Sequence, residues 1–327
     1  MKALPRARAV VGALLAVGAL AVSACTSAGG PNQAKTVYVT VTPSATSAAS
    51  AATTAPTTAP TTTPKPTPKP VKLGKPVHVS SLEGDGGVYG VGMPLVIRFS
   101  RSPTSKVAFQ KAAVVTVNGK PARGAWYWEK PFADSAMEAH YRPQTFWPAD
   151  AKIHVGLPMN KLSAGKGLSF ANNLTLDYSI GQYHYSVVDA KTLKMHVYDN
   201  GKLVRTIKVS LGKASTPTTS GTKVVMERNR VEHMSGPGYS EEVPWSVRIT
   251  NSGEFVHAAK WNSHIGVEST SHGCTNLGTA DATWFYYFSR EGDVVTYPNA
   301  PGKQMPSWDG FGDWNVNWST WQVGGAL

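Results

Sequence analysis

Short runs of apolar residues, separated by polar and turn-forming residues, recur along the chain from Leu73 to Ile180. Their length and the lack of a sustained helical period predict β-strands. Asn118-Gly119 lies between two such runs and is typical of a two-residue hairpin, because both turn positions require positive φ. The pattern predicts a small β-sandwich over residues 73–180. The runs interpreted as strands are Leu95–Phe99, Ala113–Val117, Ala125–Trp128 and Ile153–Leu157.

A second series of such runs begins at Gly181 and predicts another β-rich domain over residues 181–327. Asp199-Asn200-Gly201 and Asn251-Ser252-Gly253 have the composition of tight turns between strands. The fold class expected for the whole chain is therefore mainly β. The runs interpreted as strands here are Tyr183–Val188, Lys194–Tyr198, Leu203–Ser210, Thr222–Met226, Trp245–Thr250, Glu254–Ala258 and Val294–Tyr297.

The second domain contains one clear helical signal. Thr279 is expected to be the N-cap, because its hydroxyl can accept a hydrogen bond from the first turn. The residues expected on its apolar face are Ala280, Trp284, Phe285 and Phe288. A Trp-rich segment ends the chain and is expected to cap this domain. Its Trp residues are Trp308, Trp314, Trp318 and Trp321.

The N-terminus has the pattern of an exported protein. Basic residues precede an uncharged apolar stretch from Ala9 to Ala24, which is short for a membrane span, so residues 1–24 are interpreted as a secretory signal peptide. Small residues directly before Cys25 resemble a bacterial lipobox, in which the cysteine is lipidated; an ordinary cleavage site is the alternative. Residues 25–72 are mostly Ala, Thr, Ser and Pro, and predict a semi-extended tether.

The chain is basic, with a formal net charge of +12 at pH 7. A basic exported protein suits an envelope with anionic wall polymers and lipids. Basic and aromatic residues are not interleaved as in nucleic-acid-binding proteins, so nucleic acid is not expected as a partner.

Candidate chemistry centres on the cysteines, of which there are two, Cys25 and Cys274. If Cys25 carries lipid, Cys274 is a lone thiol in an oxidising compartment, where an unpaired cysteine is a liability unless it is used. Its segment reads Ser271-His272-Gly273-Cys274-Thr275-Asn276. An imidazole can take the proton of a thiol, and His257, at the end of a predicted strand, is better placed to do so than the neighbouring His272.

Three other interpretations fit this segment less well. A zinc site formed by Cys274, His257 and His272 lacks the paired ligand spacing of known zinc sites. A buried structural cysteine would leave the lone exported thiol unexplained. A papain-like peptidase is disfavoured, because in those chains the cysteine precedes the histidine.

The chain resembles the L,D-transpeptidase catalytic domain family, in the actinobacterial lipoprotein type with a preceding immunoglobulin-like domain. The signature is a His, some fifteen residues, then Ser/Thr-His-Gly-Cys, a variable residue and Asn. Here it is His257 followed by Ser271–Asn276. Residues 73–180 resemble the immunoglobulin-like domain. The resemblance implies an immunoglobulin-like β-sandwich followed by a β-rich L,D-transpeptidase catalytic domain.

The resemblance also implies residue roles. Cys274 would be the nucleophile and His257 the general base, oriented by the backbone carbonyl of Ala258. The N–H groups of Gly273 and Cys274 would form the oxyanion hole, in a loop shaped by Ser271 and His272. Substrate-binding positions would be Tyr239, Ser252, Gly253 and Asn276. No cofactor and no metal are expected. The lid segment Val231–Gly238 looks shorter than in mycobacterial relatives, and its Met234 is not assigned a place.

The implied activity is peptidoglycan 3→3 cross-linking through a Cys thioester, with release of D-Ala. The implied partners are donor tetrapeptide and acceptor stem peptides, the outer face of the cell membrane through a lipid anchor, and a carbapenem as inhibitor. Two alternatives stay open. One is a sortase-like or hydrolytic cysteine enzyme, such as an L,D-carboxypeptidase or another cysteine acyl hydrolase of the wall. The other is a wall-binding lipoprotein whose site is no longer active.

Overall fold

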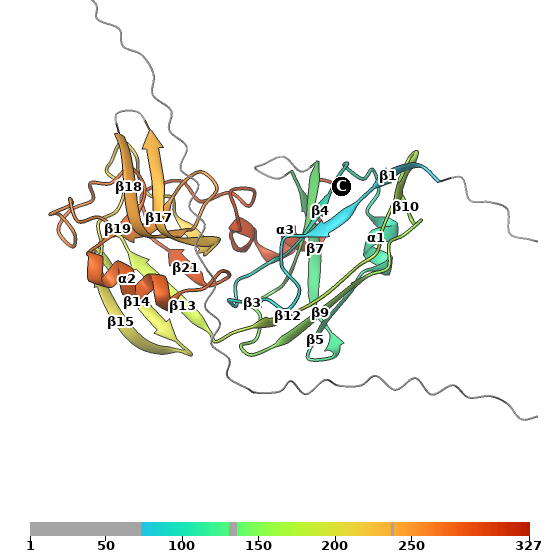
Figure 1. Ribbon diagram of the computed structural model, residues 1–327, viewed down its shortest axis with the longest axis horizontal. Helices are drawn as coiled ribbons and strands as arrows, with labels where there is room; N and C mark the ends of the chain where they lie inside the picture. The colour runs from blue at the N-terminus through green and yellow to red at the C-terminus, as the bar shows by residue number, and fades with distance from the viewer. Residues whose placement is uncertain (1–72, 131–135, 237–238) are drawn as a thin grey trace, which may run out of the picture. The chain divides into compact units, whose positions relative to one another are not determined.

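The computed structural model describes residues 73–130, 136–236 and 239–327. These residues are mainly β, which confirms the predicted fold class (Figure 1). No helix among them is long and apolar enough to cross a membrane. The predicted signal peptide, the tether and Cys25 lie outside the described residues.

The first domain contains two larger sheets and one small sheet. Their strand orders are β2-β4-β8-β7, β3-β12-β9-β5-β6 and β1-β11-β10. Aromatic side chains fill its core: Phe99 stacks on Trp128 with ring centroids 5.1 Å apart, and Phe109 meets both rings edge-on. The elements are β1 (Lys75–Val77), β2 (Val79–Ser81), β3 (Val88–Tyr89), β4 (Leu95–Phe99), α1 (Val107–Ala112), β5 (Val114–Val117), β6 (Lys120–Pro121), β7 (Gly124–Glu129), β8 (Met137–Pro143), β9 (Lys152–Leu157), β10 (Ser163–Gly165), β11 (Leu168–Phe170) and β12 (Leu174–Ile180).

The described part of the second domain has two sheets, two α-helices and a 3₁₀ helix. Their strand orders are β15-β14-β13-β21-β16 and β17-β18-β19-β20. The elements are β13 (His184–Asp189), β14 (Lys194–Asp199), β15 (Lys202–Lys208), β16 (Gly221–Val224), β17 (Glu227–Gly236), β18 (Tyr239–Arg248), β19 (Phe255–Ala258), β20 (Thr275–Leu277), α2 (Thr279–Phe288), β21 (Val294–Tyr297), the 3₁₀ helix η1 (Gly312–Asn315) and α3 (Trp318–Val323).

Two predicted turns are confirmed by their backbone angles. Asn118 and Gly119 have φ of 51° and 74°, and Asn200 and Gly201 have φ of 48° and 81°. Both pairs join adjacent antiparallel strands, β5 to β6 and β14 to β15. These angles lie in the left-handed region, which Gly and Asn tolerate better than other residues.

The predicted helix is present as α2, and two details of the prediction were wrong. Gly278, not Thr279, is the N-cap of α2, and its backbone has an extended conformation. The helix buries Ala282 and Phe285, whereas Ala280 is exposed. Because α2 packs against β18 and β19, tertiary contacts rather than local apolar spacing decide which of its faces is buried.

Trp314 and Trp321 of the C-terminal segment pack against the first domain, so the expectation that the Trp residues cap only the second domain was wrong. The Arg142 guanidinium on β8 lies 4.7 Å from the Trp314 ring centroid and 4.3 Å from that of Trp321. Trp321 is fully buried, and its indole N–H donates to the Ala125 carbonyl at 2.9 Å. Trp308 is about half exposed. The first domain offers an apolar surface that the sequence pattern did not reveal.

Candidate active site

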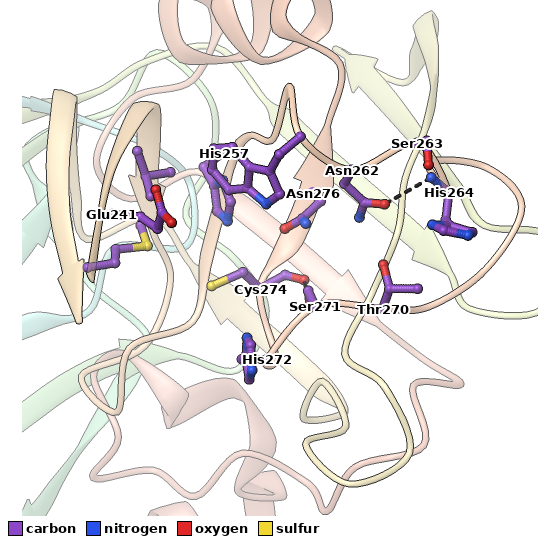
Figure 2. A pocket seen from close by; sticks show the side chains of 13 residues that line it. Glu241, His257, Asn262, Ser263, His264, Thr270, Ser271, His272, Cys274 and Asn276 are labelled. Carbon is purple, nitrogen blue, oxygen red and sulfur yellow. Dashed lines mark hydrogen bonds between the residues drawn. The ribbon is translucent and has the colours of Figure 1, made fainter. Parts of the chain in front are cut away.

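Two neighbouring strands bring the candidate catalytic residues together. β19 and β20 pair in parallel, with His257 opposite Asn276, and Cys274 directly precedes β20. Both strands are wholly buried, so their backbones are fixed by the core of the domain. Figure 2 shows the His257 ring and the Cys274 sulfur on the wall of one pocket.

The environment of His257 favours a neutral imidazole. Its side chain is buried, and Nδ1 lies 2.9 Å from the backbone carbonyl of Ala258. A carbonyl only accepts, so Nδ1 carries the proton and Nε2 keeps its lone pair. Burial lowers the pKa of His257 to about 4, although the Ala258 carbonyl acts in the opposite direction. At neutral pH the ring can therefore accept a proton.

The environment of Cys274 favours the thiol. Burial raises its pKa to about 11, and Glu254 acts in the same direction, while a hydrogen bond from the Phe255 backbone N–H opposes them. The sulfur lies 3.7 Å from the Gly253 carbonyl oxygen, to which the S–H can donate. At rest the site therefore holds a neutral thiol beside a neutral imidazole, and the proton has to move as the sulfur attacks.

Ser271 closes the loop that carries the cysteine. Its hydroxyl donates to the Cys274 carbonyl at 2.6 Å and accepts from the Gly273 N–H at 3.1 Å. Gly273 has φ of 128°, a conformation that other residues rarely adopt. The Gly273 N–H assigned to an oxyanion hole is thus already engaged, and it would have to leave Ser271 to bind a reacting carbonyl.

The other residues singled out in the loop and in β20 have different environments. His272 is exposed, and its Nε2 lies 3.2 Å from the Lys213 ammonium. Asn276 is buried on the pocket wall, and its Oδ1 has no hydrogen-bond partner. An unsatisfied buried acceptor at a pocket is suited to bind a ligand N–H group.

The structure does not bring every expected substrate residue to the pocket. Both the N–H and the hydroxyl of Ser252 bond to Asp309, at 2.7 and 2.6 Å, and Ser252 does not line the pocket. Gly253 contributes its carbonyl to the Cys274 sulfur rather than to the pocket wall. Tyr239 begins β18, and its side chain lies outside what the structure describes.

The pocket has a volume of about 390 Å³ and includes residues that the sequence motif did not indicate. Met234 on β17 and Glu241 on β18 are cross-strand neighbours, and both line the pocket, as does Val243. The described part of the lid segment, residues 231–236, lies in β17, which places Met234 at the pocket. Trp261 lies beside His257, with ring centroids 6.2 Å apart. The alternating polar pattern of β17 could have revealed this strand, which was not predicted.

No metal site is built from the pocket residues. Within the described part of the chain, one group of side chains is close enough to hold an ion: Glu129, His140 and Asp313, none of which lines the pocket. Cys274 and its two nearby histidines do not form such a group, which argues against the zinc interpretation.

Comparison with known proteins agrees with the motif. Residues 183–296 match the family of L,D-transpeptidase catalytic domains, and residues 31–163 match that of bacterial Ig domains. L,D-transpeptidase 2 of Mycobacterium tuberculosis is 34% identical over 265 residues, which are 77% of this chain and 64% of that protein. L,D-transpeptidase 5 of the same species is 31% identical over 251 residues, which are 74% of this chain and 55% of that protein. The chain thus spans about three fifths of the length of these relatives.

Solved structures show the same likeness. The L,D-transpeptidase LdtMt1 in complex with imipenem is 27% identical, with a TM-score of 0.57, and the match covers 67% of this chain and 97% of that one. An L,D-transpeptidase from Mycobacterium tuberculosis H37Rv is 26% identical, with a TM-score of 0.55 and the same coverage. The motif, the fold and these matches lead to one conclusion: the chain contains an L,D-transpeptidase catalytic domain, preceded by a bacterial immunoglobulin-like domain.

Proposed function

We propose that this protein is a peptidoglycan L,D-transpeptidase that forms 3→3 cross-links through a thioester on Cys274. One observation carries the proposal: His257, its Nδ1 held by the Ala258 carbonyl, shares a pocket with the lone described thiol. A thiol with a neutral imidazole beside it is suited to acyl transfer and needs no metal or cofactor.

The first step is acylation of Cys274. The sulfur attacks the carbonyl at the L-centre of the third residue in a tetrapeptide stem, while its proton passes to His257 Nε2. The same proton then goes to the nitrogen of the departing D-Ala, and the C–N bond breaks. A thioester remains, and Nε2 is again free. His257 thus serves as base and then as acid.

The second step transfers the acyl group. The neutral side-chain amine of a neighbouring stem attacks the thioester, and His257 takes one of its protons. That proton returns to the sulfur as the C–S bond breaks, which restores the thiol and leaves a new amide. Water in place of the amine would give the carboxypeptidase reaction with the same residues.

Several pocket groups are suited to hold the stem peptide. Asn276 Oδ1 can accept a peptide N–H, and Glu241 offers a carboxylate to an ammonium group of the substrate. The N–H groups of Gly273 and Cys274 would stabilise the oxyanion. The Gly273 N–H first has to break its hydrogen bond to the Ser271 hydroxyl. Tyr239 remains a proposed substrate contact.

The proposed place of action is the cell wall. Lipid on Cys25 would anchor the protein to the outer face of the cell membrane, and the tether over residues 25–72 would let the catalytic domain reach the wall. The basic composition of the chain suits this anionic setting.

The test is mass spectrometry of the purified protein with a disaccharide tetrapeptide. Transpeptidation predicts an acyl-enzyme on Cys274 and a cross-linked dimer that has lost one D-Ala. A tripeptide product without dimer would instead indicate a carboxypeptidase. If folded, reduced protein forms neither an acyl-enzyme nor a product, the proposal is wrong and the protein is a binding module.

A further inference from the structure

A buried ion pair lies behind the nucleophile loop. The Lys223 side chain on β16 is fully buried, and its ammonium bonds to the Glu254 carboxylate, which directly precedes β19. The ammonium also lies 4.1 Å from the centroid of the Tyr297 ring. Removing two charges from water is costly, and a buried pair is often no more stabilising than an apolar pair of the same size. Such a pair next to a nucleophile is therefore a candidate for a functional role.

The Glu254 carboxylate is held from two sides. Thr219 donates its backbone N–H to one oxygen at 2.7 Å and its hydroxyl to the other at 2.9 Å, where Lys223 also bonds. Both oxygens are therefore satisfied, and the side chain has one well-defined position.

The backbone on either side of Glu254 faces the nucleophile. The carbonyl of Gly253 lies 3.7 Å from the Cys274 sulfur, and the backbone N–H of Phe255 acts to lower the pKa of the same thiol. Anchoring the Glu254 side chain thus fixes the two backbone groups that contact the sulfur. The N–H is the more consequential of the two, because it stabilises negative charge on sulfur.

Two further links join the pair to the loop. Thr218, next to Thr219, donates its hydroxyl to the Gly273 carbonyl at 2.8 Å. The Tyr297 hydroxyl lies 2.7 Å from the hydroxyl of Thr275, the residue after Cys274. Neighbours of the pair therefore link it to the nucleophile loop in three places.

We propose that Glu254, clamped by Lys223 and Thr219, is a positioning residue that holds the Gly253–Phe255 backbone against the Cys274 sulfur. This inference rests on the proposed role of Cys274 as nucleophile. The competing explanation is a pair that stabilises the fold and leaves the sulfur unaffected.

Two double variants separate these explanations. K223M/E254Q removes both charges but retains an amide that can accept from and donate to Thr219. K223M/E254M has side chains of nearly the same size as K223M/E254Q, but its methionine at position 254 cannot form the hydrogen bonds to Thr219. Neither leaves a buried charge unpaired, so both are expected to fold. R205M removes a cation that pairs with Asp281 on α2, away from the pocket, and serves as control.

The readouts are the rate of Cys274 alkylation by iodoacetamide at pH 9 and the acylation of Cys274 by imipenem. Loss of the Phe255 N–H raises the thiol pKa, and each pKa unit lowers the thiolate fraction that iodoacetamide alkylates about tenfold. The same loss removes stabilisation of the negative charge that develops on sulfur as it attacks imipenem. We expect K223M/E254M to slow alkylation and the maximal acylation rate about tenfold or more, with an unchanged half-saturating imipenem concentration. K223M/E254Q should stay within about threefold of wild type, and R205M should match wild type.

Equal alkylation rates in wild type and both folded double variants would overturn the inference. If K223M/E254M does not fold, the variant to test is Glu254→Asp. Aspartate keeps the negative charge, but its side chain is one methylene shorter, so the carboxylate lies farther from Thr219 and Lys223. Slower alkylation of that variant supports positioning, and an unchanged rate overturns it. Wild type that is alkylated but never acylated by imipenem or by stem peptide would contradict the proposed function alone.

Discussion

His257 and Asn276 lie directly opposite each other in the parallel pair of β19 and β20. This register brings a histidine that is distant in sequence beside the residue two positions after Cys274. Because both strands are buried, the spacing between the proposed base and the nucleophile loop is set by backbone hydrogen bonds rather than by flexible side chains.

The two histidines near Cys274 should differ in their effect on catalysis. His257→Ala removes the proposed base and should lower the acylation rate by a factor of about 10²–10⁴ with the fold intact. His272→Ala removes an exposed ring that contacts Lys213, so it should cause a partial loss through loop order. Single-turnover acylation, with circular dichroism as the fold control, measures both. A rate near wild type for His257→Ala would refute its assignment as base.

Acylation of wild type should depend little on pH across the neutral range. The reactive form is the neutral pair, which exists between the His257 pKa of about 4 and the Cys274 pKa of about 11. The rate should therefore fall as pH drops toward about 4, because His257 then binds a proton and can no longer act as base. Imipenem acylation measured from about pH 4 to about pH 9 tests this. A steep rise through neutral pH would instead indicate a reaction that needs preformed thiolate.

A carbapenem should acylate Cys274 and give a stable one-to-one adduct. Its strained carbonyl is a good electrophile for a thiol with an adjacent base, and the ring-opened product resembles the proposed thioester. Intact-protein mass spectrometry detects the adduct, and peptide mapping distinguishes Cys274 from Cys25. Cys274→Ser should show no adduct at that peptide. Absence of any adduct on folded, reduced wild type, with several carbapenems, would favour an inactive binding module.

Cys25→Ala should release the protein from the membrane. The prediction rests on the small residues Val22-Ser23-Ala24 before Cys25 and on the Ala/Thr/Pro-rich segment after it. Fractionation of the native host, followed by immunoblotting, compares the variant with wild type. If both remain in the membrane fraction to the same extent, the lipobox interpretation is wrong.

His140 should contribute strongly to stability. Burial disfavours its charged form, but Asp313, Glu138 and Glu129 outweigh this and raise the pKa of His140 well above its usual value. His140→Gln leaves buried carboxylates without their cation and should reduce the free energy of unfolding by about 3–5 kcal/mol. The stabilisation that protonated His140 provides is fully present below the pKa of about 6.5 that histidine has in the unfolded chain. It is lost as the pH rises through the higher pKa of His140 in the folded protein.

Urea denaturation at several pH values measures the effect of His140→Gln. His154→Gln is the matched control, because His154 also pairs with an aspartate at 2.8 Å but is about half exposed. An exposed pair contributes about 0–1 kcal/mol. Equal losses for the two variants would show that the buried cluster is not stabilising.

The sequence by itself determined the mainly β fold and the residues that carry the proposed chemistry. Strand periodicity and turn pairs such as Asn118-Gly119 are local properties, since each depends on neighbours in the chain and on allowed φ. The Ser271–Asn276 motif with an upstream His257 was likewise readable along the chain. The family matches agree with that reading.

Only the tertiary structure decided what surrounds those residues. Trp321 packs on Arg142 of the first domain, and the Ser252 hydroxyl bonds to Asp309. In α2, Ala282 is buried and Ala280 is not. Lys223 also pairs with Glu254 behind the nucleophile. These contacts join residues far apart in the chain, and which partners meet depends on the packing of whole sheets, a property that no local pattern of residues encodes.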